Sequence, residues 1–123
     1  MTVDLAALYQ ELRSAWKEAT GSVCEVCGAE ASATVRIEGH HIVRQQLIKA
    51  AAKSGKWPSS ELARLLWDLR NKLDLCERCH VRHHRRLGTL KWVLIESLAP
   101  ASIAFAEQVG LLWRAKLDYD LEA

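Results

Sequence analysis

The chain has 123 residues, of which 50% are hydrophobic and 26% are charged. This composition is ordinary for one soluble globular domain and excludes a disordered chain, while a net charge of +2 selects no class of partner. No stretch reaches the uncharged length of a transmembrane helix, and the N-terminus lacks the basic start and apolar run of a signal peptide. We therefore expect a cytoplasmic protein without membrane partners.

The first third of the chain is expected to contain a helix, a cysteine pair and a strand. Residues 4–19 place apolar side chains at spacings of three and four, which predicts a helix that packs on the core through Trp16. Cys24 and Cys27 then form a C-x-x-C pair. Residues 33–38 alternate apolar and polar side chains and predict a half-buried strand.

Two adjacent histidines, His40 and His41, follow that strand. Neighbours on an extended strand point to opposite faces of the sheet, so we expect the two imidazoles to have distinct roles. Residues 44–56 and 58–69 then show helical spacing of their apolar side chains. These two helices make up a predicted helical insert at residues 44–70.

The second cysteine pair lies between a predicted strand and a predicted helix. Leu73 and Leu75 alternate with polar residues and predict a short strand directly before Cys76 and Cys79. From His80 the pattern becomes helical and is expected to stop at Gly88.

The remaining residues, 89–123, are expected to form a helical C-terminal extension. Residues 90–98 and 101–117 predict two helices that are separated at Pro100 and cover the core, with a dimer surface as the alternative for the first. We therefore expect an α+β fold that is mostly helical, in one domain over residues 1–123 with its core at 22–88.

The four cysteines permit a metal site, disulfides or a thiol redox centre. Because a cytosolic chain is kept reduced, and because no thioredoxin-like pattern surrounds either pair, we favour a metal. Four thiolates around tetrahedral Zn²⁺ leave no open position for a substrate, so the predicted site is structural.

Basic residues are concentrated in one short segment of the chain. They are opposed there only by Asp74 and Glu77, and they comprise Arg70, Lys72, Arg78, Arg82, Arg85, Arg86 and Lys91. Such a strip is either a solvated helix face or a surface that binds a polyanion.

All five histidines lie in two clusters, at 40–41 and at 80–84. On a helix, His80 and His84 are four residues apart and lie on the same face. A second metal site, with fewer protein ligands than the metal can accept, is the economical interpretation.

This combination resembles the HNH endonucleases, also called ββα-metal nucleases, and small phage-encoded members in particular. Asn71 stands five positions before the C-x-x-C-H run, and His80 and His84 follow it by nine and thirteen positions, as in that family. The resemblance covers residues 24–84. It is carried by His40-His41-Ile42, Trp67-Asp68-Leu69-Arg70-Asn71, Leu75-Cys76, Cys79-His80 and His84.

The resemblance implies a role for each matching residue. His41 would be the general base, Asn71 would pin the loop that carries it, and His40, His80 and His84 would bind a catalytic divalent ion. The cysteines Cys24, Cys27, Cys76 and Cys79 would bind structural zinc. DNA phosphates would be contacted by Arg70, Lys72, Arg82, Arg85 and Arg86, whereas His83 receives no role.

The implied reaction is hydrolysis of DNA phosphodiester bonds, by nicking or double-strand cleavage, with 5′-phosphate and 3′-hydroxyl products. Many members have aspartate where this chain has His40, which favours Zn²⁺, Ni²⁺ or Mn²⁺ over strict Mg²⁺. The usual Gly-Gly turn is replaced by the insert at 44–70. DNA is the implied partner in a bacterial or phage-infected cell, with phage packaging proteins or a homodimer left open. The alternative is a non-catalytic zinc-knuckle module that binds nucleic acid.

Overall fold

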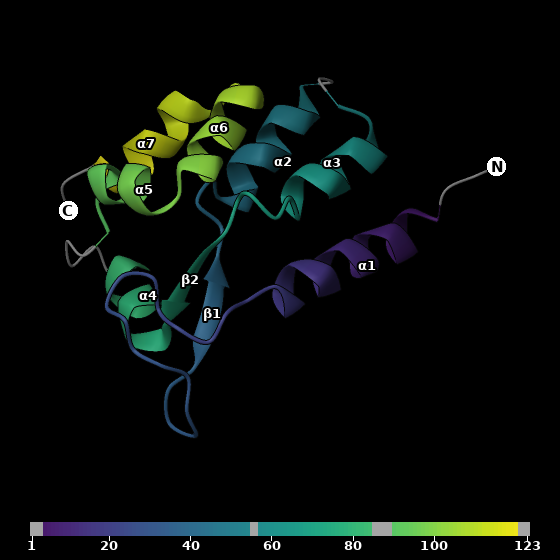
Figure 1. The fold of residues 1–123 in the computed structure, drawn as a ribbon. Helices are drawn as coiled ribbons and strands as arrows, with labels where there is room; N and C mark the ends of the chain where they lie inside the picture. Colours follow the sequence, from purple (N-terminus) through teal and green to yellow (C-terminus); the bar gives the residue numbers. More distant parts are fainter. Residues whose placement is uncertain (1–3, 55–56, 85–89, 121–123) are drawn as a thin grey trace.

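The computed structural model describes residues 4–54, 57–84 and 90–120, and within them the chain forms helices around one small sheet (Figure 1). The elements, in chain order, are α1 (Leu5–Glu18), β1 (Ile37–His40), α2 (Gln45–Lys53), α3 (Ser59–Leu66), β2 (Leu73–Cys76), α4 (Glu77–His84), α5 (Trp92–Leu98), α6 (Pro100–Gln108) and α7 (Leu112–Asp120). This arrangement confirms an α+β fold that is mostly helical.

The two strands form an antiparallel pair with α4 packed against both of them. The register places Ile37 opposite Cys76 and His40 opposite Leu73. Helix α4 begins at Glu77, directly after β2 and three residues earlier than the sequence pattern predicts. Helix α4 therefore runs beside the two strands, as Figure 1 shows.

The other helices pack in two groups beside this strand pair. Helix α2 packs on α3, α3 packs on α1, and α5, α6 and α7 pack on one another (Figure 1). The core between them is apolar, and its fully buried large side chains include Phe105, Ile42, Ile48, Leu73, Leu75 and Ile95.

Helix α1 is held against the strand pair by the Trp16 indole, which packs on Gly39 of β1. A Cβ atom on Gly39 would lie 2.7 Å from two ring carbons of Trp16, so only glycine lets the indole lie on β1. Trp16 is 3% exposed, which confirms the prediction that it belongs to the core.

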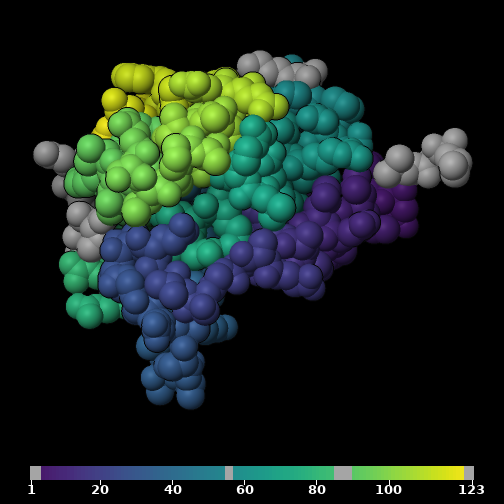
Figure 2. Space-filling view, viewed as in Figure 1, coloured from purple at the N-terminus to yellow at the C-terminus, as the bar shows by residue number. Residues whose placement is uncertain are grey.

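The strand predicted at residues 33–38 is displaced toward the histidines. Pairing begins only at Ile37, because its partner β2 is four residues long and ends opposite it at Cys76. Upstream, the Ser32 hydroxyl accepts hydrogen bonds from the backbone N–H groups of Thr34 and Val35, which stabilises a turn instead of a strand. Figure 2 shows the segment at 30–36 projecting from the body of the molecule.

The helix predicted at 101–117 is two helices. Gly110, at φ +72°, ends α6 in a Schellman motif, in which its N–H donates to the Glu107 carbonyl and that of Leu111 donates to the Ala106 carbonyl. In the insert, α3 ends at Leu66, so Leu69 is 59% exposed rather than on the buried face expected for it. The predicted helix end at Gly88 lies outside the described residues. Within the described ranges, no helix combines the length and apolar composition needed to cross a membrane.

Candidate functional site

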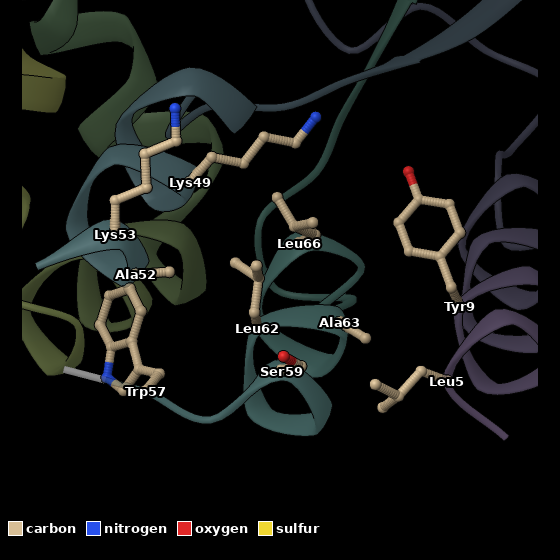
Figure 3. Close-up of a pocket in the computed structure, with 10 residues that line it drawn as sticks. All are labelled: Leu5, Tyr9, Lys49, Ala52, Lys53, Trp57, Ser59, Leu62, Ala63 and Leu66. Carbon is tan, nitrogen blue, oxygen red and sulfur yellow. The ribbon is translucent and has the colours of Figure 1, made fainter. Parts of the chain in front are cut away.

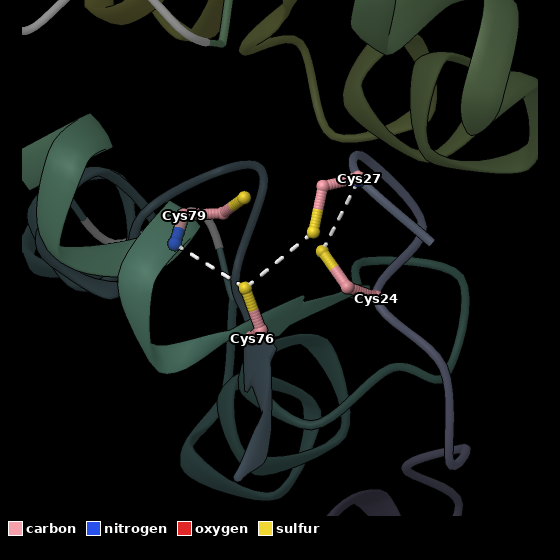
Figure 4. A group of neighbouring side chains, drawn as sticks. All are labelled: Cys24, Cys27, Cys76 and Cys79. Carbon is pink, nitrogen blue, oxygen red and sulfur yellow. Dashed lines mark hydrogen bonds between the residues drawn. The ribbon is translucent and has the colours of Figure 1, made fainter. Parts of the chain in front are cut away.

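The four cysteines gather where the segment after α1 meets β2 and α4 (Figure 4). Their sulfur atoms all lie within 4.8 Å of one another, and all four thiols are free. The Sγ atoms of Cys27 and Cys76 are 3.7 Å apart, too far for a disulfide. Four sulfurs at about 2.3 Å from a tetrahedral zinc ion would be about 3.8 Å apart.

The backbone around this cluster favours thiolates. The N–H groups of Cys27 and Cys79 point at the sulfurs of Cys24 and Cys76 over 3.5 Å, and Gly28 permits the first turn at φ +78°. Burial raises the pKa of Cys24, but backbone N–H groups outweigh it and lower that pKa to about 6. Burial and the neighbouring sulfurs raise the pKa of Cys79. The cluster can therefore hold a metal ion such as zinc, whose charge would permit all four thiolates to ionise together.

Three histidines form a second cluster between β1 and α4. His40 ends β1, while His80 and His84 lie one turn apart on α4. The distance is 3.3 Å from His40 Nδ1 to His80 Nε2 and 3.0 Å from His80 Nε2 to His84 Nε2. Nitrogens bound to one ion at about 2.0–2.1 Å would be about 3.0–3.4 Å apart, so this spacing fits a shared metal.

Two hydrogen bonds fix which ring nitrogens are free to bind it. His80 Nδ1 donates to the Glu38 carboxylate over 2.8 Å, so in the neutral imidazole Nε2 carries the lone pair. The Tyr119 hydroxyl donates to the Ile42 carbonyl, so its oxygen accepts from His40 Nε2 over 3.0 Å and leaves His40 Nδ1 bare.

These assignments leave His40 Nδ1 and His80 Nε2 unprotonated and pointing toward each other. When both imidazoles are neutral, these two lone pairs at 3.3 Å repel each other unless a proton or a metal cation lies between them. Burial lowers the pKa of His40 well below its ordinary value, any protonation of His83, His80 or His84 would lower it further, and burial also lowers the pKa of His84. The imidazoles of His40 and His84 are therefore neutral near pH 7, and the neutral imidazole is the form that binds metals.

Asn71 holds the loop at residues 41–44, which we call the histidine loop. Its side-chain oxygen accepts from the Val43 N–H over 2.7 Å, and its amide nitrogen donates to the Val43 carbonyl over 2.9 Å. Asn71 is fully buried, so both bonds are shielded from water. The amide therefore holds the loop through both polar groups of the Val43 backbone.

His41 contacts a different set of elements from His40. Its ring stacks on Trp16 of α1 with centroids 4.2 Å apart, and its Nε2 donates to the Leu66 carbonyl at the end of α3 over 2.8 Å. Its Nδ1 lies 3.5 Å from the Gln45 amide of α2. The two imidazoles therefore have distinct surroundings, as expected for neighbours at the end of a strand.

A pocket of about 330 Å³ opens beside His41. Gln45 lines it together with the aromatic rings of Tyr9, Trp16 and Trp67, and two cations of α1, Arg13 and Lys17, lie at the same pocket. A second hollow, of about 460 Å³, lies between α1, α2 and α3 (Figure 3). Leu62 and Leu66 line this hollow with Lys49 and Lys53, and no residue of either metal-ligand cluster lines it.

The predicted DNA contacts do not all fit the structure. Lys72 is not placed to contact DNA, because its side chain is 7% exposed, paired with Asp74 and packed over the Trp16 ring. Arg70 is 39% exposed and forms an ion pair with Asp68. Arg82 is half-buried on α4. Arg85 and Arg86 lie outside the described residues.

Two residues that orient the histidines were missed in the sequence. Glu38 stands two positions before His40, so its side chain shares that face of β1, and this spacing was a usable signal. Tyr119 is separated from His40 by 79 positions, and no local pattern marks it. His83, which had no assigned role, stacks on Tyr119 with centroids 5.1 Å apart.

No family model, curated protein or solved structure matches this chain. What the chain does is therefore inferred from its own side chains.

Proposed function

We propose that this chain is a metal-dependent endonuclease of the HNH type that hydrolyses DNA phosphodiester bonds. The observation that carries the proposal is the convergence of imidazole nitrogens from His40, His80 and His84 next to a loop pinned by Asn71. A catalytic metal site requires ligands that leave a position open, and His84 at the exposed edge of the cluster leaves such an approach.

The cysteine cluster supplies the second half of the proposal. Four cysteine sulfurs within 4.8 Å of one another suit structural Zn²⁺, whose site would be closed to substrate. The ion would join the first C-x-x-C turn to the start of α4, the helix that carries His80 and His84. In this proposal the zinc positions the catalytic histidines and takes no part in the reaction.

His41 is the proposed general base. Its Nε2 is occupied by the Leu66 carbonyl, so Nδ1 is the atom that accepts a proton from the attacking water. Burial lowers the pKa of His41, which keeps the imidazole neutral near pH 7. His40, His80 and His84 would hold the divalent ion, whose charge stabilises the phosphate oxygens in the transition state when it is bound.

One observation favours a second candidate, a zinc-stabilised module that binds nucleic acid without cutting it. His41 contacts α1, α2 and α3, whereas the three candidate metal ligands meet between β1 and α4, with Tyr119 of α7 next to His40. A binding module would retain the cysteines and the basic side chains and would need no alignment of His41 with a metal.

Cleavage of supercoiled plasmid separates the two candidates. The zinc-loaded protein is incubated with Mg²⁺, Mn²⁺, Ni²⁺ or added Zn²⁺, alongside the variants His41→Ala and His80→Ala. Loss of a general base is expected to lower the rate about 10²–10⁴-fold. The control is Gln46→Ala, an exposed neighbour on α2 that is expected to cut like the wild type.

Circular dichroism and zinc content must show that each variant is folded. A folded, zinc-loaded His41→Ala protein that cuts as fast as the wild type would show that the proposed base is wrong. A wild type that binds DNA but leaves the plasmid intact in every metal would instead support the binding module.

A further inference from the structure

Helix α7 contacts the histidine loop at two consecutive residues. The Asp118 carboxylate pairs with Arg44 over 2.9 Å, and the Tyr119 hydroxyl donates to the Ile42 carbonyl. The same hydroxyl oxygen lies 3.0 Å from His40 Nε2. The C-terminal extension therefore reaches both the loop and one candidate metal ligand, although nothing in the family resemblance covers residues beyond 84.

We propose that Tyr119 is a positioning residue that sets the tautomer and ring orientation of His40 for metal binding. This inference rests on the metal site of the proposed function. A histidine ligand commonly donates its second ring N–H to a neighbouring acceptor, which fixes the tautomer and makes the ligand more basic. Glu38 is the acceptor for His80, and Tyr119 takes that place for His40.

The hydrogen-bond balance determines the direction of each bond. A tyrosine hydroxyl has one proton, and the Ile42 carbonyl can only accept, so the proton lies between them. The hydroxyl oxygen can then only accept from His40, which places the imidazole proton on Nε2 and the lone pair on Nδ1. Nδ1 is the atom that faces His80, so Tyr119 turns the metal-binding nitrogen of His40 toward the cluster.

The hydroxyl is held in place by its surroundings. Tyr119 is 4% exposed, and its ring lies parallel to His83, with an interplanar angle of 13°. Trp92 of α5 packs on the ring at 5.7 Å between centroids. His83 thus packs on one face of the Tyr119 ring.

The matched variants are Tyr119→Phe and Tyr9→Phe, which change the two tyrosines of the chain. Tyr9 lies on α1 and packs edge-on against Trp67, so it controls for the general loss of a hydroxyl. With zinc already bound to the cysteines, Ni²⁺ is titrated calorimetrically into each protein. Tyr119→Phe is expected to weaken Ni²⁺ binding about 10–100-fold, whereas Tyr9→Phe is expected to bind like the wild type.

A second measurement requires no metal in the histidine site. Nitrogen-15 NMR of the imidazoles reports which ring nitrogen carries the proton. In the wild type, His40 is expected to be protonated at Nε2 only, and in Tyr119→Phe it is expected to become a mixture of tautomers. A purely structural tyrosine would lower stability without changing this signal.

The outcomes are separable. Wild-type Ni²⁺ affinity together with an unchanged His40 tautomer in Tyr119→Phe would overturn the positioning role. A wild type that binds no Ni²⁺ would overturn the proposed metal site, and the tautomer signal would then decide the role of Tyr119 alone. If Tyr119→Phe does not fold, 3-fluorotyrosine is incorporated into Tyr9→Phe, where it labels only position 119. An unshifted His40 nitrogen signal there would also overturn the inference.

Discussion

The histidine loop is fixed by side chains from the middle and from the C-terminal part of the chain. Asn71, before β2, takes both polar groups of the Val43 backbone, and Tyr119, on α7, takes the carbonyl of Ile42. Ile42 and Val43 are themselves fully buried. The backbone of the loop is therefore restricted to one conformation, because a displacement would leave buried N–H and carbonyl groups without hydrogen-bond partners.

We expect Asn71→Ala to destabilise the protein by about 2–5 kcal/mol, because it leaves a buried N–H and a buried carbonyl of Val43 unpaired. Urea unfolding of the zinc-loaded protein measures this loss. Ser32→Ala is the control, since it also removes side-chain bonds to backbone N–H groups but at an exposed turn, and it is expected to cost less than about 1 kcal/mol. Equal losses in the two variants would contradict the pinning role.

At the scale of elements, α4 serves both candidate metal sites. It begins directly at the end of β2, so Cys79 faces the cysteine cluster while His80 and His84 face β1. The same helix carries Arg82 in the basic segment. Because one rigid helix holds all these groups, a shift of α4 would disturb both sites together.

Arg82, on α4, and Lys72, which precedes β2, are expected to contribute differently to the salt dependence of DNA binding. Each lost phosphate contact reduces the slope of log K against log salt by about 0.9. Arg82→Gln is expected to show such a reduction. Lys72→Gln is expected to leave the slope unchanged, because that side chain is buried against Trp16 and paired with Asp74.

Fluorescence anisotropy over a range of salt concentrations, in the His41→Ala background so that DNA stays intact, gives both slopes. Lys72→Gln is instead expected to lower stability by about 1–3 kcal/mol, because Asp74 loses a buried partner. A reduced slope for Lys72→Gln with an unchanged slope for Arg82→Gln would reverse this assignment.

At the scale of the whole molecule, the cysteine cluster joins segments that are distant in sequence. Cys24 and Cys27 precede β1, whereas Cys76 and Cys79 follow the helical insert. The sheet that it supports has only two strands of four residues, and an isolated pair of that size is marginal in water. The folded structure of the strand pair and of α4 is therefore expected to depend on the metal.

Removal of zinc is expected to unfold the centre of the domain. Structural zinc contributes about 10–16 kcal/mol of apparent binding free energy in small domains. The net free energy of unfolding of a native protein is only about 5–15 kcal/mol, so loss of the ion can exceed it. Circular dichroism with and without a strong chelator measures the change, and adding zinc back should restore the signal. Cys24→Ser should have the same effect without chelator. A chelated protein with an unchanged melting curve would contradict this expectation.

Local spacing in the sequence was sufficient for several features. The C-x-x-C turns, the His80 and His84 pair on one helix face, and the short strand before Cys76 depend on neighbours a few residues apart, which the backbone geometry fixes. The bounds of β1 were missed because they depend on the length of its partner strand. The end of α6 was missed although Gly110 marks it, since the apolar pattern continues past that residue.

The sequence by itself determined that this chain carries two clusters of potential metal ligands on an α+β framework. Only the tertiary structure decided which nitrogens are bare, because tautomers depend on Glu38 and on the distant Tyr119. It also decided that Lys72 is buried and that His41 faces α1, α2 and α3. Ligand type and spacing are local properties, whereas the direction of a hydrogen bond and the exposure of a charge are set by whatever residues fold against them.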